Sequence, residues 1–254
     1  MNIPEPMYRA PLGTLLVSGP DARNFLQGQL TVDVQRLSAD NVLLAACNSA
    51  QGRVQSVLWL VERSDGIGLL VNRALLQQTL ARLRRYVLRA KVTIEAERLQ
   101  VAVVSAAESA ITLTDDHAHR QVDERSYVRL LGHNLLLLVA PIAEHFAVEP
   151  TAASVWHIEH VRAGLPEIYP ETHEQFVAQM LNLDLLDGIS FEKGCYTGQE
   201  IIARTHFRGA IKRRMFRFSA RCPAPTPATR LLFGDQHAGD VVYAIAVDDG
   251  CELL

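Results

Sequence analysis

Two apolar runs near the N-terminus lie close together in the sequence and constrain the fold more than any other feature. "NVLLAAC" (41–47) and "RVQSVLWLVE" (53–62) are joined by "NSAQG", a turn-rich loop that closes on Gly52. Such a loop joins the strands of a β-hairpin. The flanking segments read as strand 13–19, helix 20–30, strand 67–72, helix 72–89 and strand 91–97. This order predicts an antiparallel α+β layer and not a parallel βαβ sheet.

The rest of the sequence predicts further strands and one helix, in keeping with the α+β class. Strands are expected at "QVAVVSA", "SYVRLL" and "NLLLLVA", and a helix at "SVWHIEHVRAG" that ends at Gly164. Three further strand-like segments follow: "IKRRMFRFSA", "TRLLFG" and "DVVYAIAV". The proline-rich stretch "RCPAPTPAT" between the first two is the best candidate for an internal boundary. We therefore predict one region over 1–217 and a small C-terminal β module over 218–254, too short for a full barrel.

The composition is that of an ordinary soluble protein. The 254 residues are 48% hydrophobic and carry a net charge of −3, which argues against a dedicated nucleic-acid binder. No run approaches the roughly 18 apolar residues of a membrane span. Prolines interrupt the N-terminal stretch where a signal peptide would need an apolar core. We predict a cytoplasmic, monomeric protein that binds neither membrane nor nucleic acid directly.

The cysteines and histidines show no metal-site spacing. The four cysteines are Cys47, Cys195, Cys222 and Cys251, and they form no C-x-x-C pair. A disulfide framework and a structural zinc site are both unexpected. The histidines form neither an H-x-x-x-H nor an H-E-x-x-H pattern. No bound metal is predicted.

One short stretch, "FEKGCYTGQE" (191–200), stands out. Thr197 and Glu200 have the spacing of a capping box, which predicts that a helix starts here. Gly194 and Gly198 allow unusual dihedrals and close backbone approach.

Cys195 sits between Gly194 and Tyr196, ahead of that helix and close to Lys193. A helix dipole and a lysine charge both stabilise a thiolate, so Cys195 is a candidate reactive thiol. The alternative is a passive small residue in a turn.

"KGCYTGQE" resembles the signature of the YgfZ family, folate-binding proteins related to the T-protein (aminomethyltransferase) of the glycine cleavage system. The resemblance extends to "GPDARNFLQGQLTVDV", to "VRAGLPEI" and to the whole of "QMLNLDLLDGISFEKGCYTGQEIIARTHFRGAIKRR". It implies an α+β fold with two intertwined domains around a central folate site and a small C-terminal β-barrel. It also implies tetrahydrofolate as ligand and a role in maintaining iron–sulfur enzymes, including those that modify tRNA.

Two local features depart from the T-protein pattern. T-proteins carry an acidic pair where this chain has Gln55 and Ser56, and a glutamate where it has Arg162. Neither a carboxamide nor a hydroxyl is ionised at neutral pH to stabilise a developing cation. T-proteins also lack the cysteine of the signature. The resemblance therefore favours the YgfZ branch over an aminomethyltransferase.

The resemblance assigns several polar residues to a folate site, each beside a simpler alternative. Lys193 pairs with the folate glutamate tail or is a solvated lysine. Gln199 contacts the ligand or is a surface residue, and Glu200 contacts the pterin or caps the helix. Arg204 binds the ligand or pairs with Glu200 one turn earlier. The remaining candidates are Tyr196, Arg162 and Asp33, the last of which is either a turn residue or a site carboxylate.

A basic cluster follows the motif. Its members are Arg204, Arg208, Lys212, Arg213, Arg214 and Arg217, with no acidic residue between them. A charge run is usually a solvated face. The sharper alternatives are a landing site for a polyglutamylated folate tail, for an acidic partner protein or, least favoured by the net charge, for tRNA.

Three functional hypotheses follow. The first is a tetrahydrofolate-binding accessory protein for iron–sulfur cluster assembly or repair, with Cys195 as functional thiol and iron–sulfur enzymes or assembly proteins as partners. The second is a folate-dependent aminomethyl or one-carbon transferase. The third is a non-catalytic adaptor. We favour the first, and we expect no stably bound cluster because one cysteine cannot supply four ligands.

Overall fold

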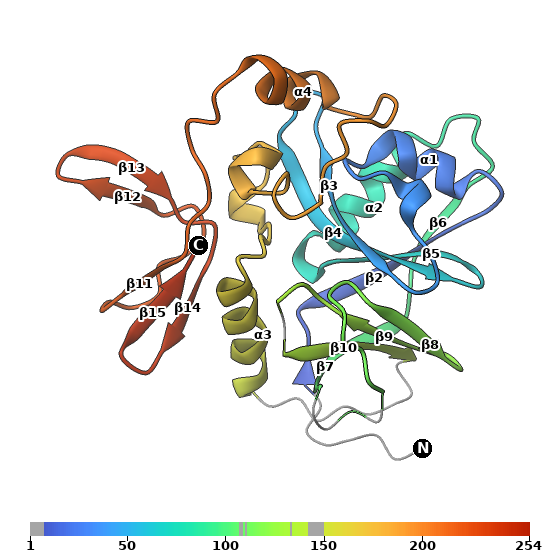
Figure 1. The fold of residues 1–254 in the computed structure, drawn as a ribbon, viewed down its shortest axis with the longest axis horizontal. Helices are drawn as coiled ribbons and strands as arrows, with labels where there is room; N and C mark the ends of the chain where they lie inside the picture. Colours follow the sequence, from blue (N-terminus) through green and yellow to red (C-terminus); the bar gives the residue numbers. More distant parts are fainter. Residues whose placement is uncertain (1–7, 107–108, 110, 133, 142–149) are drawn as a thin grey trace.

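The computed structural model describes residues 8–106, 109, 111–132, 134–141 and 150–254 (Figure 1). The proline-containing stretch at 1–7, on which the absence of a signal peptide was predicted, lies outside these residues. The strands are β1 (Tyr8–Arg9), β2 (Leu12–Ser18), β3 (Val42–Asn48), β4 (Val54–Arg63), β5 (Gly66–Asn72), β6 (Thr93–Ala96), β7 (Leu99–Ser105), β8 (His119–Val122), β9 (Arg125–Arg129), β10 (Leu135–Pro141), β11 (Phe218–Ala220), β12 (Arg230–Phe233), β13 (Gln236–Asp240), β14 (Ala244–Val247) and β15 (Gly250–Leu253). The helices are α1 (Ala22–Gln29), α2 (Leu76–Arg85), α3 (Pro150–Ala163) and α4 (Gln199–Arg208), with short 3-10 turns η1 (Val34–Arg36), η2 (Arg73–Leu75), η3 (Pro170–Thr172) and η4 (Ala178–Leu181).

Two five-stranded sheets form the body of the molecule. Their strand orders are β3-β4-β5-β2-β6 and β1-β7-β10-β9-β8, and every pair is antiparallel. The predicted antiparallel α+β class is therefore confirmed. The chain starts in one sheet and continues in the other, because Tyr8 pairs with Val103 of β7 whereas Leu15 pairs with Leu69 of β5.

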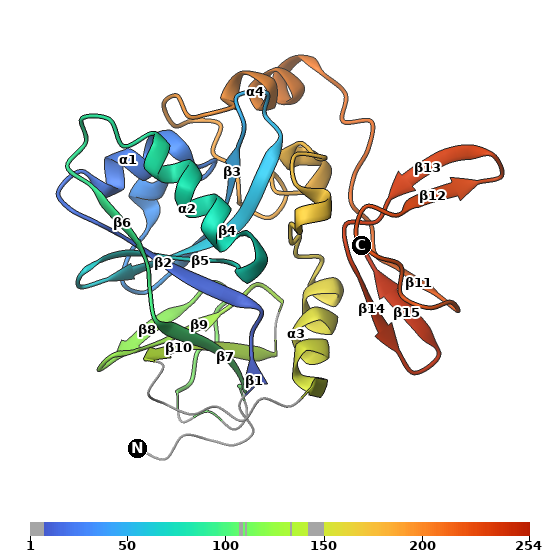
Figure 2. The ribbon, with the colours of Figure 1, turned by 180° about the vertical axis from the view of Figure 1, so that it is seen from behind.

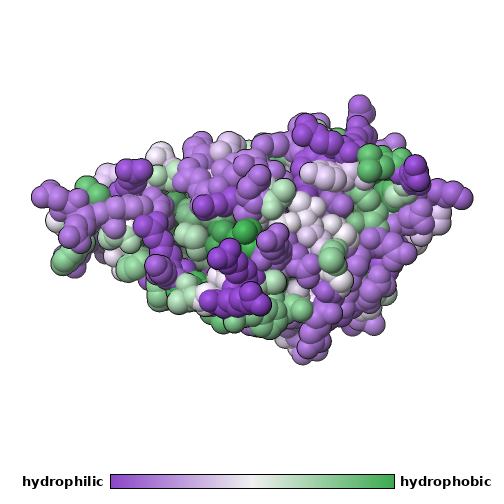
Figure 3. Space-filling model, turned by 90° about the horizontal axis from the view of Figure 1, so that it is seen from above, coloured by the Kyte–Doolittle hydropathy of each residue, from purple (hydrophilic) through white to green (hydrophobic). Residues whose placement is uncertain are grey.

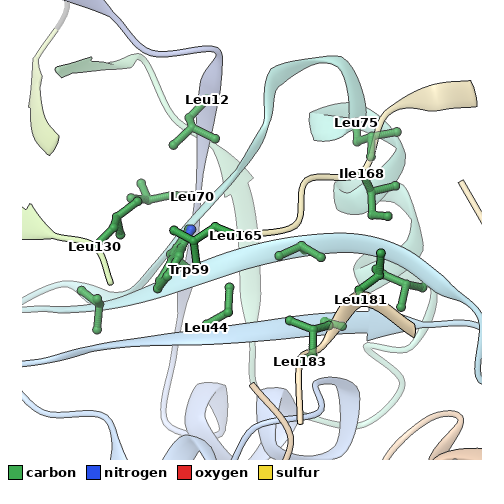
Figure 4. Packing of buried hydrophobic residues seen from close by; sticks show 14 of the residues in the cluster. Leu12, Leu44, Trp59, Leu70, Leu75, Leu130, Leu165, Ile168, Leu181 and Leu183 are labelled. Atoms are coloured by element: carbon green, nitrogen blue, oxygen red, sulfur yellow. The ribbon is translucent and has the colours of Figure 1, made fainter. Parts of the chain in front are cut away.

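The first sheet is buried on both faces, which explains why β3 is an unbroken apolar run. Leu43 and Ala45 belong to the core that contains α1 and α2. Leu44 and Ala46 belong to the core shared with the second sheet and with the segment that follows α3. Figure 4 shows Leu44 and Trp59 of the β3–β4 pair facing side chains from that segment, including Leu165 and Leu183. Alternation along a strand places successive side chains on opposite faces.

The segment after α3 returns to the first sheet. Gly164 ends the helix with a φ of +67°, as its position in "VRAGL" predicts. Farther on, the backbone of Val54 donates to Phe176 (2.8 Å) and accepts from Glu174 (2.9 Å). This return brings the motif, which is remote in sequence, to the β3–β4 hairpin.

The C-terminal module consists of two small open sheets, β11-β15-β14 and β12-β13, and no closed barrel forms among the described residues. α3 stands between these strands and the second five-stranded sheet in both views (Figure 1, Figure 2). The strand expected over 211–220 is shorter than predicted, because only Phe218–Ala220 finds a partner, in β15. Over the described part of the chain, no helix is long and apolar enough to cross a membrane.

Candidate functional site

Hydrogen bonds hold the motif loop on the C-terminal end of α1 and on the turn that follows it. Thr31 is fully buried, and its hydroxyl donates to the carbonyl of Gly188 (2.6 Å). The Thr31 carbonyl accepts from the amide of Ser190 (2.9 Å), and Gly28 accepts from the amide of Thr197 (3.2 Å). The loop is thus fixed at both ends before α4 begins.

Lys193 points into the protein. Its ammonium donates to the carbonyls of Leu30 (2.9 Å) and Val32 (2.7 Å) and lies 5.0 Å from the centre of the Tyr196 ring. Burial lowers the pKa of Lys193 to about 8, against the opposing charge of Asp33. Lys193 is therefore not a solvated lysine, and two of its three donors fasten the loop.

The helix starts where the sequence predicts, but not by the predicted cap. α4 begins at Gln199, and its N-cap is Gly198, with a φ of +83° and no side-chain capping bond. The prediction of a capping box between Thr197 and Glu200 is therefore wrong. The Thr197 amide, which the Glu200 side chain was expected to satisfy, already donates to Gly28.

Gly198 allows the motif to touch the β3–β4 turn. A Cβ at Gly198 would lie 2.7 Å from the carbonyl oxygen of Ser49 and 2.9 Å from Cα of Gly52. A Cβ at Gly52 would in turn lie 2.8 Å from Cβ of Ile201. The two glycines therefore pack backbone against backbone, and this contact sets the position of α4.

The Gly198→Ala variant should lose about 2 to 5 kcal/mol of unfolding free energy, because it combines a left-handed backbone with a clash against main-chain atoms. Urea unfolding measures this loss. Gly194→Ala is the matched control, because a Cβ there meets nothing within 4 Å, and it should change stability by less than about 0.5 kcal/mol. Equal losses in the two variants would contradict the packing argument.

The motif leaves its thiol outside. Cys195 is a free, exposed cysteine. Tyr196 beside it is buried, and its hydroxyl has no hydrogen-bond partner among the described residues. Burial raises the pKa of Tyr196 to about 12. Gln199 is half-buried, whereas Glu200 is exposed. The structure thus presents Cys195 to solvent at the edge of an ordered loop.

Two other predicted site residues have structural roles. Asp33 accepts from the Gln27 side chain (2.7 Å) and from the amide of Gln35 (3.2 Å), so it is a turn residue. Arg162 lies away from the motif and donates to Glu252 of β15 (2.7 Å), which joins α3 to the C-terminal module.

The basic cluster is partly neutralised. Arg214 forms a bidentate ion pair with Asp184 (2.7 and 2.8 Å). The Arg213 guanidinium lies 3.5 Å from the Asp240 carboxylate. Arg204, by contrast, is exposed and has no ion pair with Glu200 within the described ranges. Seen from above, the molecule is largely hydrophilic, with hydrophobic patches between the polar groups (Figure 3).

A cleft of about 470 Å³ lies beside the β3–β4 turn. One wall is the turn itself, through Ser49, Ala50 and Gln51, and another is α2. Its polar lining includes Gln55 and Ser56, which stand at the positions of the T-protein acidic pair. Arg82, Arg85 and Glu174 also line it. None of the predicted residues from 191 to 204 lines it. The turn that Gly198 touches connects the motif to the cleft, and α1 provides a second connection through Gly28 and Gln29.

Arg82 organises the cleft. Its guanidinium donates to the side chains of Gln29 (2.6 Å) and Gln55 (3.1 Å) and to the carbonyl of Asn48 (3.0 Å). In the part of the chain that the structure describes, neither Arg82 nor Arg85 has a carboxylate within 4 Å. Cys47 also lines the cleft. Burial raises the pKa of its thiol, against the opposing effect of the Arg82 charge, and keeps the thiol neutral.

The sequence interpretation missed a buried acidic centre. Glu167 is 5% exposed and accepts from the Tyr169 hydroxyl (2.9 Å) and the Asn72 amide (3.1 Å). His157 lies 3.8 Å away and bonds the same tyrosine hydroxyl (2.9 Å). Burial raises the pKa of Glu167 to about 7. The run "PEIYPE" gave no periodic signal that would separate this carboxylate from a solvated one.

Glu167 should make stability fall as the pH rises. The pKa of its carboxyl is raised from 4.5 when unfolded to about 7 when folded, so the protonated form favours the fold. Its contribution is complete below pH 4.5 and is lost as the pH rises through 7. Glu167→Gln, which mimics the protonated acid, should remove this fall in urea unfolding measured at several pH values. Parallel curves for the two proteins would contradict it.

Comparisons with known proteins show the family to which the chain belongs. No protein-family model matches the chain. "tRNA-modifying protein YgfZ" of Serratia proteamaculans is 34% identical over 92% of this chain and 78% of that protein. The protein of the same name from Escherichia coli O157:H7 is 33% identical over 92% of this chain and 79% of its own length. The chain belongs to the YgfZ family.

The fold of this YgfZ-family chain is also that of a T-protein. The aminomethyltransferase T of the Bartonella henselae glycine cleavage system superposes with a TM-score of 0.78, over 97% of this chain and 76% of that one. Sequence identity is 14%, so this likeness concerns the fold alone. The predicted T-protein-like α+β architecture is confirmed, with open C-terminal sheets in place of a barrel.

Proposed function

We propose that this YgfZ-family chain binds tetrahydrofolate, or a one-carbon derivative of it, and supports the assembly or repair of iron–sulfur enzymes, including those that modify tRNA. The name of its relatives, tRNA-modifying protein, supports the last part. The observation that carries the folate part is the cleft beside the motif, with two guanidinium groups that lack a carboxylate partner among the described residues.

The cleft suits the chemistry of a folate. Its volume of about 470 Å³ is within the usual range for a small-molecule site. Arg82 and Arg85 would bind the carboxylates of the glutamate tail, since a guanidinium matches a carboxylate with two parallel hydrogen bonds. Gln55 and Ser56 supply the neutral donors and acceptors that a pterin ring needs. Tyr86 lies under the Arg82 guanidinium, 4.6 Å from it, and adds an aromatic face.

An aminomethyltransferase is less well supported by the same cleft. Its lining contains one carboxylate, Glu174, and that group accepts a hydrogen bond from Gln55 (2.6 Å). Arg162, at the position of a T-protein glutamate, pairs with Glu252 instead. The cleft lining also contains His173, so it is the missing carboxylates, and not a lack of every acid–base group, that disfavour an aminomethyltransferase.

Cys195 is the proposed functional thiol. It is exposed on a loop that is fixed on both sides, so a partner protein can reach it. Within the described residues, no three His, Cys, Asp or Glu side chains are placed to hold a metal ion. One thiol supplies one ligand, so Cys195 would hold a cluster only transiently or exchange with a thiol of the iron–sulfur partner.

Calorimetric titration with tetrahydrofolate under anaerobic, reducing conditions tests the cleft. We expect saturable binding in the micromolar range. Arg85→Ala should weaken it roughly 5- to 30-fold, because one charge-assisted pair is lost. Arg89→Ala, an exposed arginine outside the cleft, is the matched control and should leave the affinity unchanged. Binding that is absent, or equally strong in Arg85→Ala, would overturn this assignment.

A further inference from the structure

Two cysteines that are far apart in the sequence meet in the C-terminal module. The sulfur atoms of Cys222 and Cys251 lie 3.8 Å apart, although 29 positions separate the residues. The strand pairing explains the contact, because Ala220 of β11 lies opposite Cys251 of β15 and Cys222 follows two residues later. The scattered spacing of the cysteines in the sequence gave no sign of this pair.

The two thiols differ in accessibility. Cys251 is 1% exposed and belongs to the small core of the module, with Val241 and Leu253. Cys222 lies at the start of the proline-rich loop and is exposed. Burial and the neighbouring thiol raise the pKa of Cys251. Cys222 is therefore the group that an external reagent meets first, with Cys251 directly behind it.

We propose that Cys222 and Cys251 form a reversible disulfide, so that the C-terminal module carries a redox-sensitive site separate from Cys195. A disulfide bond of about 2 Å requires the sulfurs to approach by a little under 2 Å. Cys222 lies on a loop and Cys251 on β15, the central strand of its three-stranded sheet, so the side chain of Cys222 has to supply most of that movement.

The reaction needs a disulfide as oxidant, and a low-molecular-weight disulfide such as oxidised glutathione supplies it. The Cys222 thiolate attacks one glutathione sulfur, forms a mixed disulfide and releases one glutathione thiolate. The Cys251 sulfur then attacks the Cys222 sulfur and expels the second glutathione. Each protein thiol loses one proton to a departing thiolate. The protein gains one disulfide, and one oxidised glutathione becomes two reduced molecules.

Simpler interpretations fit less well. Within the described residues, no third His, Cys, Asp or Glu side chain completes a metal site with this pair. A purely structural packing role would leave Cys222 without a purpose at the surface. The pair also encloses β12, β13 and β14, because all three lie between its members. A bond there would close that part of the module into one covalent loop, which a module with so small a core would benefit from.

Thiol counting after incubation with oxidised glutathione tests the proposal. The count is made on Cys195→Ser, so that glutathione on Cys195 cannot contribute. After unfolding, this variant should fall from three reactive thiols to one, and when folded from the one exposed thiol, Cys222, to none. Mass mapping should find a peptide linked through Cys222 and Cys251. Cys195→Ser should form the same link, whereas Cys222→Ser, an exposed substitution that spares the core, should not.

Two outcomes would overturn it. One is a stable mixed disulfide with glutathione on Cys222 that never resolves, since Cys251 would then not be in reach. The other is a link that contains Cys195, or one that joins two chains through Cys222. Neither outcome would bear on folate binding, which the titration of the cleft tests separately.

Discussion

The close backbone contact between Gly198 and the turn at Ser49–Gly52 is the constraint on which the rest of the site depends. It allows a helix to begin directly against a hairpin that precedes it by some 150 positions in the chain. The segment after α3 must cross the first sheet to reach this point, and its apolar side chains fill the second face of that sheet as it does so. Burial of that face supplies the free energy that holds the motif in place.

The same contact explains the division of labour within the motif. Lys193 and Tyr196 point inward and fasten the loop, which leaves Cys195 at the surface. The turn that receives Gly198 also forms one wall of the cleft, through Ser49, Ala50 and Gln51. A ligand in the cleft would thus contact the β3–β4 turn, and a partner protein at Cys195 would contact the motif that packs on that turn. The contact would therefore couple the proposed folate site to the proposed functional thiol.

Local sequence patterns predicted much of the fold. The hairpin loop, the apolar periods of the helices and the glycine at 164 act over a few residues, and the structure confirms each. The capping box failed because a tertiary bond from Thr197 to Gly28 replaced it. The strand over 211–217 failed because alternation alone cannot supply a pairing partner. Glu167 and the pair of Cys222 and Cys251 depend on contacts between distant segments, which no local pattern records.

The most direct test of this account is the level of iron–sulfur-dependent tRNA modification in cells whose own copy is replaced by Cys195→Ser. Melting of the purified variant should match that of the wild type, because the thiol is exposed and the loop is held by other groups. The account predicts that modification falls to the level of cells without the protein. Full modification with Cys195→Ser would contradict it, and Cys195 would then be a passive residue in the turn.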